Sequence, residues 1–76
     1  MPLTPLELAV LAYLSDRPNR VVKRSELLRE VWQRSHVGSN VVDGVVRSLR
    51  KKLGVYRDSI QTVTGHGYRF PGRVSE

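Results

Sequence analysis

The clearest pattern in this chain is an amphipathic stretch over residues 40–53. Val42, Val46, Leu49 and Leu53 recur at the spacing of one stripe along an α-helix. At about 100° per residue, the positions that point away from this stripe are small, polar or basic: Asn40, Gly44, Arg47, Ser48 and Lys51. Gly44 stands in the middle of this outward face, where glycine costs roughly 1 kcal/mol relative to alanine. The pattern favours a helix whose backbone is approached closely by a partner.

Two more helices are predicted before this stretch. Thr4 to Glu7 has the form of a capping box with proline at the first helical position. The broad apolar face expected after it consists of Leu8, Val10, Leu11 and Leu14. A second helix is expected from about Arg24 to Trp32, after a short extended segment at Val21–Val22. The polar segment from Gln33 to Ser39 predicts a loop, and Ser39 is placed to cap the third helix.

The pattern changes after Gly54, which is placed to end the third helix. Ile60–Thr64 is β-branched, Gly65–Gly67 predicts a turn, and Tyr68–Phe70 alternates aromatic residues, so a β-hairpin is expected. Three helices followed by a hairpin is the order of an α+β winged helix-turn-helix, in which the hairpin is the wing. A three-helix bundle with a disordered tail is the alternative, and the alternating aromatics argue against it. We therefore predict a single winged-helix domain over residues 1–76.

The charge of the chain narrows the kind of partner. The 76 residues carry a formal net charge of +6, and all 13 Lys and Arg residues lie from Arg17 onward. A basic charge gathered on one part of a small domain favours a polyanionic partner such as nucleic acid.

What the sequence lacks excludes several other classes of function. There is no cysteine, and His36 and His66 stand apart from other metal-ligand residues, so we expect no metal site. There is no run of about 18 apolar residues and no signal peptide, which favours a cytoplasmic protein with no membrane partner. No Gly-rich phosphate loop and no nucleophile–base pair is recognised, so we expect no enzyme and no cofactor.

Four motifs stand in order along the chain: Leu3–Leu8, Glu26–Trp32, Val42–Asp43 with Leu49–Leu53, and Gln61–Phe70. Together, at these spacings, they make residues 3–70 similar to the winged-helix effector domains of OmpR/PhoB-type response regulators. The resemblance implies a transcription regulator of a two-component system that binds double-stranded DNA. It places the third helix, about residues 40–53, in the major groove, and the wing, about residues 60–70, on the adjacent minor groove or its backbone.

The resemblance also implies partners beyond DNA. The loop Gln33 to Ser39 would be available to RNA polymerase, and such domains usually bind direct repeats in tandem. The isolated domain is expected to be monomeric, and these residues contain no receiver domain.

The sequence departs from the family pattern in three places. The small sheet that usually precedes the first helix is largely missing. Thr64 stands where the family often has an arginine that enters the minor groove, so His66, Arg69 or Arg73 is expected to substitute for it in part. Lys23 stands where the second helix usually begins with Ser or Thr, which weakens the cap by about 1 kcal/mol but places a cation near the phosphates.

Individual side chains carry this interpretation with different alternatives. Arg47 and Lys51 are the leading contacts to DNA, with solvated charges as the alternative. Ser48 is expected to meet a base edge or a phosphate, while Asp43 is expected to be structural, paired with Arg47 or with Arg50. The predicted DNA-binding residues are Lys23, Arg24, Trp32, Asn40, Val41, Gly44, Val45, Arg47, Ser48, Arg50, Lys51, Thr62, Thr64, His66 and Arg69.

Some of these residues have a second interpretation. Val45 is expected either to contact a thymine methyl group or to pack partly in the core. Trp32 is expected in the core, with its indole N–H near a phosphate as the resemblance implies. Tyr68 and Phe70 are expected as core aromatics beneath the wing. The sequence therefore predicts sequence-specific DNA binding, with a protein-interaction module or an RNA-binding winged helix as the rival functions.

Overall fold

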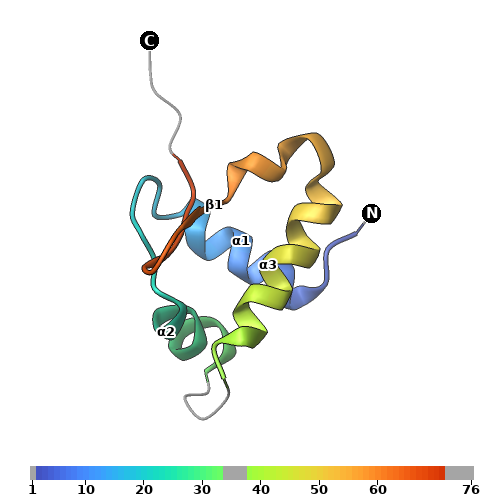
Figure 1. Cartoon of the computed structure of the whole chain (residues 1–76). Helices are drawn as coiled ribbons and strands as arrows, with labels where there is room; N and C mark the ends of the chain where they lie inside the picture. The colour runs from blue at the N-terminus through green and yellow to red at the C-terminus, as the bar shows by residue number, and fades with distance from the viewer. Residues whose placement is uncertain (1, 34–37, 72–76) are drawn as a thin grey trace.

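A computed structural model describes residues 2–33 and 38–71 of the chain. The α+β order predicted from the sequence is confirmed: helices come first and an antiparallel hairpin last (Figure 1). The elements are α1 (Pro5–Ser15), α2 (Arg24–Leu27), η1 (Leu28–Trp32), α3 (Asn40–Leu53), η2 (Gly54–Ser59), β1 (Gln61–Val63) and β2 (Gly67–Arg69).

Helix α1 begins at the predicted capping box. The Thr4 hydroxyl accepts a hydrogen bond from the Glu7 amide at 3.2 Å, and the Glu7 carboxylate accepts one from the Thr4 amide at 2.9 Å. Val10 and Leu14 are fully buried, but Leu8 is 56% exposed, so the prediction that Leu8 faces the core was wrong. Because α1 is apolar on most of its sides, periodicity could not orient it.

The predicted second helix spans its expected range, Arg24 to Trp32, but its last part is π-helical. Gln33, with a φ of 59°, ends it. The prediction that Ser39 caps α3 was wrong. Its side chain makes no capping bond, and its carbonyl instead accepts from the Val42 amide at 3.0 Å. Gly54 does end α3 as predicted, with a φ of 59°.

The hairpin of β1 and β2 is joined by a third backbone segment. Val22 forms an isolated antiparallel bridge with Tyr68, with hydrogen bonds of 2.8 and 3.0 Å between their backbones. This confirms the short extended segment predicted at Val21–Val22. Gly67 allows the close approach, because a Cβ atom there would lie 2.1 Å from the Val22 carbonyl oxygen. The hairpin is therefore tied to the chain just before α2.

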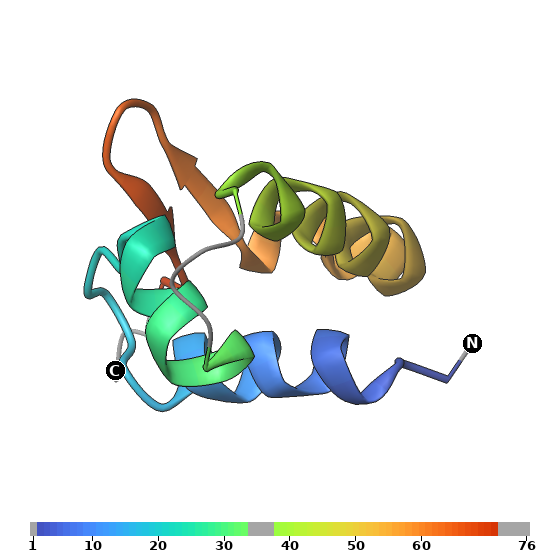
Figure 2. The ribbon, with the colours of Figure 1, turned by 90° about the horizontal axis from the view of Figure 1, so that it is seen from below.

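The core lies between α1 on one side and α3 with the hairpin on the other (Figure 2). Tyr68 is buried, as predicted, and Phe70 packs against the core. The buried apolar residues are Val10, Leu14, Val22, Leu27, Leu28, Val42, Val46, Leu49, Ile60 and Tyr68. This packing leaves the opposite face of α3 and the tip of the hairpin turned outward.

One element was not predicted. Residues between α3 and β1 form the 3-10 helix η2, which turns back from the end of α3 toward the hairpin (Figure 1). Its residues Val55 and Tyr56 are 89% and 69% exposed. Its sequence has neither apolar periodicity nor alternation, which is why the pattern did not mark it.

Candidate DNA-binding interface

Helix α3 has one buried face and one exposed face, and the sequence pattern assigned most positions to the correct face. Val42, Val46 and Leu49 are buried against the rest of the domain. The exposed positions of its outward face are Asn40, Gly44, Arg47 and Lys51. Val41 and Val45 lie at the edge of the core and are half-buried.

The fold itself does not require a glycine at position 44. Its backbone is helical, and a Cβ atom built there would meet no other group within 4 Å. An alanine would therefore fit and would favour the helix. The glycine is unexplained inside the domain and leaves the backbone of α3 open to contact from outside.

The cations of the chain divide into paired and unpaired groups. In the part of the chain that the structure describes, four ion pairs join Arg20 to Glu26, Arg24 to Asp43, Arg29 to Glu30 and Lys52 to Glu7, at 2.6, 2.8, 3.1 and 2.8 Å. Within residues 2–33 and 38–71, the basic side chains that make no ion pair or hydrogen bond are Lys23, Arg47, Lys51 and Arg57. Two of these four, Arg47 and Lys51, lie on the outward face of α3, where the unbalanced positive charge is free for a partner.

Asp43 joins the elements that carry this face. Its carboxylate accepts a hydrogen bond from the Tyr68 hydroxyl of β2 and one of 2.8 Å from Arg24 of α2. The Tyr68 bond, assisted by Arg24 and opposed by burial, lowers the pKa of the Asp43 carboxyl. The structural role expected for Asp43 fits these contacts, but the predicted pairing with Arg47 or Arg50 was wrong. Asp43 binds side chains of α2 and β2 rather than a side chain one or two turns further along α3.

The predicted outward position of Ser48 was wrong. Its hydroxyl donates to the carboxylate of Glu7, and its side chain is half-buried against α1. One turn later Lys52 donates to the same carboxylate at 2.8 Å. The bonds from Lys52, Ser48 and the Thr4 amide lower the pKa of Glu7 from 4.5 to about 2. Sequence reasoning gave Glu7 only its capping role, because nothing local indicates partners that lie more than 40 positions along the chain.

Arg50 and Thr62 contact each other: Arg50 is half-buried, and Thr62 is exposed. The Arg50 guanidinium donates two hydrogen bonds to the Ile60 carbonyl, at 3.1 and 2.7 Å, and one of 2.8 Å to the Thr62 hydroxyl. They hold the start of β1 against α3. Contacts of Arg24, Arg50 and Thr62 with DNA stay predictions, and the contacts observed are internal to the domain.

At the tip of the wing, Thr64 and His66 are exposed, as a contacting turn requires. Arg69 donates to the Gln61 side chain across the hairpin at 2.5 and 3.2 Å. At the other end of the interface Lys23 is exposed just before α2, whereas Trp32 is half-buried against the core. Residues 34–37 of the loop expected to contact RNA polymerase, which include His36, lie outside the described residues, and so does Arg73.

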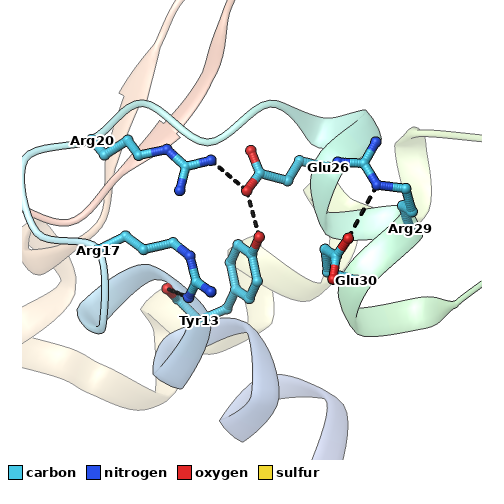
Figure 3. A network of polar contacts seen from close by, with 6 residues as sticks. All are labelled: Tyr13, Arg17, Arg20, Glu26, Arg29 and Glu30. Atoms are coloured by element: carbon cyan, nitrogen blue, oxygen red, sulfur yellow. Dashed lines mark hydrogen bonds and ion pairs between the residues drawn. The ribbon is translucent and has the colours of Figure 1, made fainter.

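A network of polar contacts lies where α1, the turn after it and α2 meet (Figure 3). The Tyr13 hydroxyl and Arg20 both donate to Glu26, and the Arg17 guanidinium lies 3.6 Å from the centre of the Tyr13 ring. Burial opposes the ionisation of Glu26, but the bonds from Tyr13 and Arg20 outweigh it and lower its pKa. Because the network joins α1, the following turn and α2, the side chains of Arg17 and Arg20 are already bound inside the domain.

The described part of the chain contains no group of three or more His, Cys, Asp or Glu residues that could hold a metal ion. No helix within it has the length and apolar character needed to cross a membrane.

Comparison with known proteins gives one family and consistent relatives. Residues 1–70 match the family described as "Transcriptional regulatory protein, C terminal". The chain is 44% identical over 73 residues to the transcriptional regulatory protein AfsQ1 of Streptomyces coelicolor, covering 91% of the chain and 32% of that protein. It is also 44% identical to SrrA of Staphylococcus aureus, covering 90% of the chain and 30% of that protein. The chain thus spans about a third of the length of these curated relatives.

Solved structures agree with the fold. The DNA-binding domain of the response regulator AdeR, solved in complex with an intercistronic region, superposes with a TM-score of 0.85 at 29% identity, over 100% of this chain and 82% of that one. The DNA-binding domain of CadC of E. coli superposes with a TM-score of 0.83 at 30% identity, over 96% of this chain and 72% of that one.

Proposed function

Because this chain belongs to the family of C-terminal domains of transcriptional regulatory proteins, we propose that it binds double-stranded DNA sequence-specifically and so regulates transcription. The observation that carries the proposal is the division of the cations. Arg47 and Lys51 lie on the exposed face of α3 and make no ion pair or hydrogen bond within residues 2–33 and 38–71. By contrast, Arg20, Arg29 and Lys52 are bound to carboxylates. Unpaired cations on an exposed helix suit phosphate contacts.

The structure supports a division of labour along α3. Its first half exposes small side chains and bare backbone at Asn40 and Gly44, so this half enters the major groove, with Val41 and Val45 at its edges. Its second half carries Arg47 and Lys51, which contact the phosphates. Affinity then comes mainly from the second half and sequence discrimination from the first.

The wing completes the proposed interface. Thr64 and His66 at the tip approach the neighbouring minor groove or its backbone, and Arg69 joins them if it leaves Gln61. On the α2 side, the DNA backbone is contacted by Lys23 and by the indole N–H of Trp32. Since Thr64 carries no charge, this wing contributes few base contacts.

The wider context is also proposed. AdeR, whose DNA-binding domain has this fold, is a response regulator. We therefore propose that the domain serves a two-component system in the cytoplasm and binds direct repeats in tandem. Contact with RNA polymerase through the loop Gln33 to Ser39 is part of the same proposal.

The test is selection of bound fragments from a random duplex pool, followed by a salt titration. We expect enrichment of one motif and a linear fall of log K with log salt, with a slope of roughly −0.9 for each phosphate contacted. Lys51→Ala should reduce the steepness by about one such unit. The matched control is Arg29→Ala, which removes an exposed charge already paired with Glu30. Equal binding of duplex RNA, or binding without salt dependence, would favour the RNA-binding or protein-interaction alternatives.

A further inference from the structure

Two adjoining hollows between α3, η2 and β1 form a basic trough. The first, of about 930 Å³, is lined by Arg47, Arg50, Lys51, Val55, Arg57 and Asp58, with Gly54 at its base. The second, of about 690 Å³, extends toward β1 along Gln61 and Thr62. Arg50, Arg57 and Asp58 line both, so the two hollows lie side by side. We refer to the surface formed by these residues as the trough.

The charge of the trough is not balanced internally. Four cations line it against one carboxylate, that of Asp58. Arg47, Lys51 and Arg57 make no ion pair or hydrogen bond within residues 2–33 and 38–71, and Arg50 is bound only to neutral oxygens. The last turn of α3 adds the negative end of its helix dipole, which accounts for some but not all of this excess.

We propose that the trough holds the DNA backbone at the C-terminal end of α3, with Arg57 of η2 as a phosphate contact outside the helix-turn-helix and the wing. This inference rests on the proposed function and extends its footprint. Arg47 and Lys51, one helical turn apart, line the first hollow from α3, and Arg57 lines it from η2. Cations from two elements that line one hollow can together neutralise more phosphates than the exposed face of α3 alone.

Val55 supports the same placement. It is 89% exposed beside Arg57, and it is not needed for the core. An apolar side chain beside a bound nucleic-acid strand can pack against a sugar. A strongly hydrated acidic peptide offers no such apolar group for Val55 to contact. The charge excess and this edge therefore favour a nucleic-acid strand over an acidic protein segment.

The experiment measures the salt dependence of binding to a random-sequence duplex of about three helical turns, which requires no knowledge of the operator. Arg57→Ala should make the slope of log K against log salt less steep by roughly 0.9. Between 50 and 200 mM salt, one such contact corresponds to about a 3.5-fold difference in affinity. Arg57→Lys should restore most of the slope, since it keeps the charge. Asp58→Asn should tighten binding, because it removes the one acid that faces the strand.

Arg29→Ala serves as the matched control. The Arg57 variants should melt like the parent chain, because the Arg57 side chain makes no ion pair or hydrogen bond within residues 2–33 and 38–71. If Arg57→Ala behaves like Arg29→Ala while Lys51→Ala still reduces the slope, the trough inference is overturned and the proposed function stands. If neither Arg57→Ala nor Lys51→Ala changes the slope, both are overturned.

Discussion

Substitutions of Gly44 should have opposite effects on the stability of the domain and on its binding to DNA. Gly44 sits in the interior of α3 with open space around its missing side chain. Gly44→Ala should stabilise the domain by about 1 kcal/mol, because alanine has the higher helix propensity. With an unfolding entropy of about 2.1 cal/mol/K per residue, this corresponds to a rise in melting temperature of roughly 6 °C.

A larger side chain at the same position should weaken DNA binding. Gly44→Leu should retain a gain of several tenths of a kcal/mol in helix propensity, while its side chain fills the space through which the groove floor approaches the backbone. We expect loss of binding to the selected duplex in a variant that melts above the parent chain. Thermal unfolding by circular dichroism and fluorescence anisotropy with labelled DNA measure the two effects on one preparation.

Gly54, at the other end of the same helix, is the matched control. With a φ of +59° and a ψ of −114°, it occupies a conformation that alanine adopts only with strain. Gly54→Ala should therefore lower the melting temperature, where Gly44→Ala raises it. A Gly44→Leu variant that melts higher and binds DNA like the parent would refute a docking role for this glycine. A Gly44→Ala variant that melts lower would refute the argument on its open surroundings.

Three further predictions concern packing, pH and the wing. Ile60→Val should destabilise the domain by about 0.5–1.5 kcal/mol in chemical denaturation, because Ile60 is almost fully buried; no change would place it outside the core. Since the pKa of Glu7 falls from 4.5 unfolded to about 2 folded, its ionised form contributes stability above pH 4.5 that is lost as the pH falls toward 2. The stability advantage of the parent over Glu7→Gln should shrink over that range, and a constant difference would contradict the assignment. Thr64→Arg should tighten binding most at sites with A·T-rich flanks, and equal affinities on all flanks would show that the wing stays away from the minor groove.

Local patterns in the sequence predicted most of the fold. The capping box at Thr4, the stripe of α3, the stop at Gly54 and the hairpin alternation are each confirmed, because each depends on a few neighbouring residues. Ser39 shows the limit of such reasoning: a residue of the right type stands at the start of α3 but makes no cap, since its backbone is already helical.

The errors in the site share another cause. The positions of Ser48 and Asp43 were predicted from helical geometry alone. Each side chain instead forms a hydrogen bond with a residue far away in the sequence, Ser48 with Glu7 and Asp43 with Tyr68. Ser48 stands at the boundary between the two faces of α3, where a rotation of a few tens of degrees decides its partner. Positions in the middle of a face, such as Gly44 and Lys51, do not have this ambiguity, and these remain the outward positions.

The shared carboxylate of Asp43 has a consequence for how the domain and its DNA adapt to each other. Because it binds Arg24 and Tyr68 at once, the separation between α3 and the hairpin is set inside the protein. In the proposed complex these two elements occupy a major groove and the next minor groove, so the distance between α3 and the hairpin determines the distance between grooves that the protein can bind. The duplex must then adopt the twist and groove width that match this distance. Base pairs that no side chain touches would thereby influence affinity, through the stiffness of the steps between the two grooves.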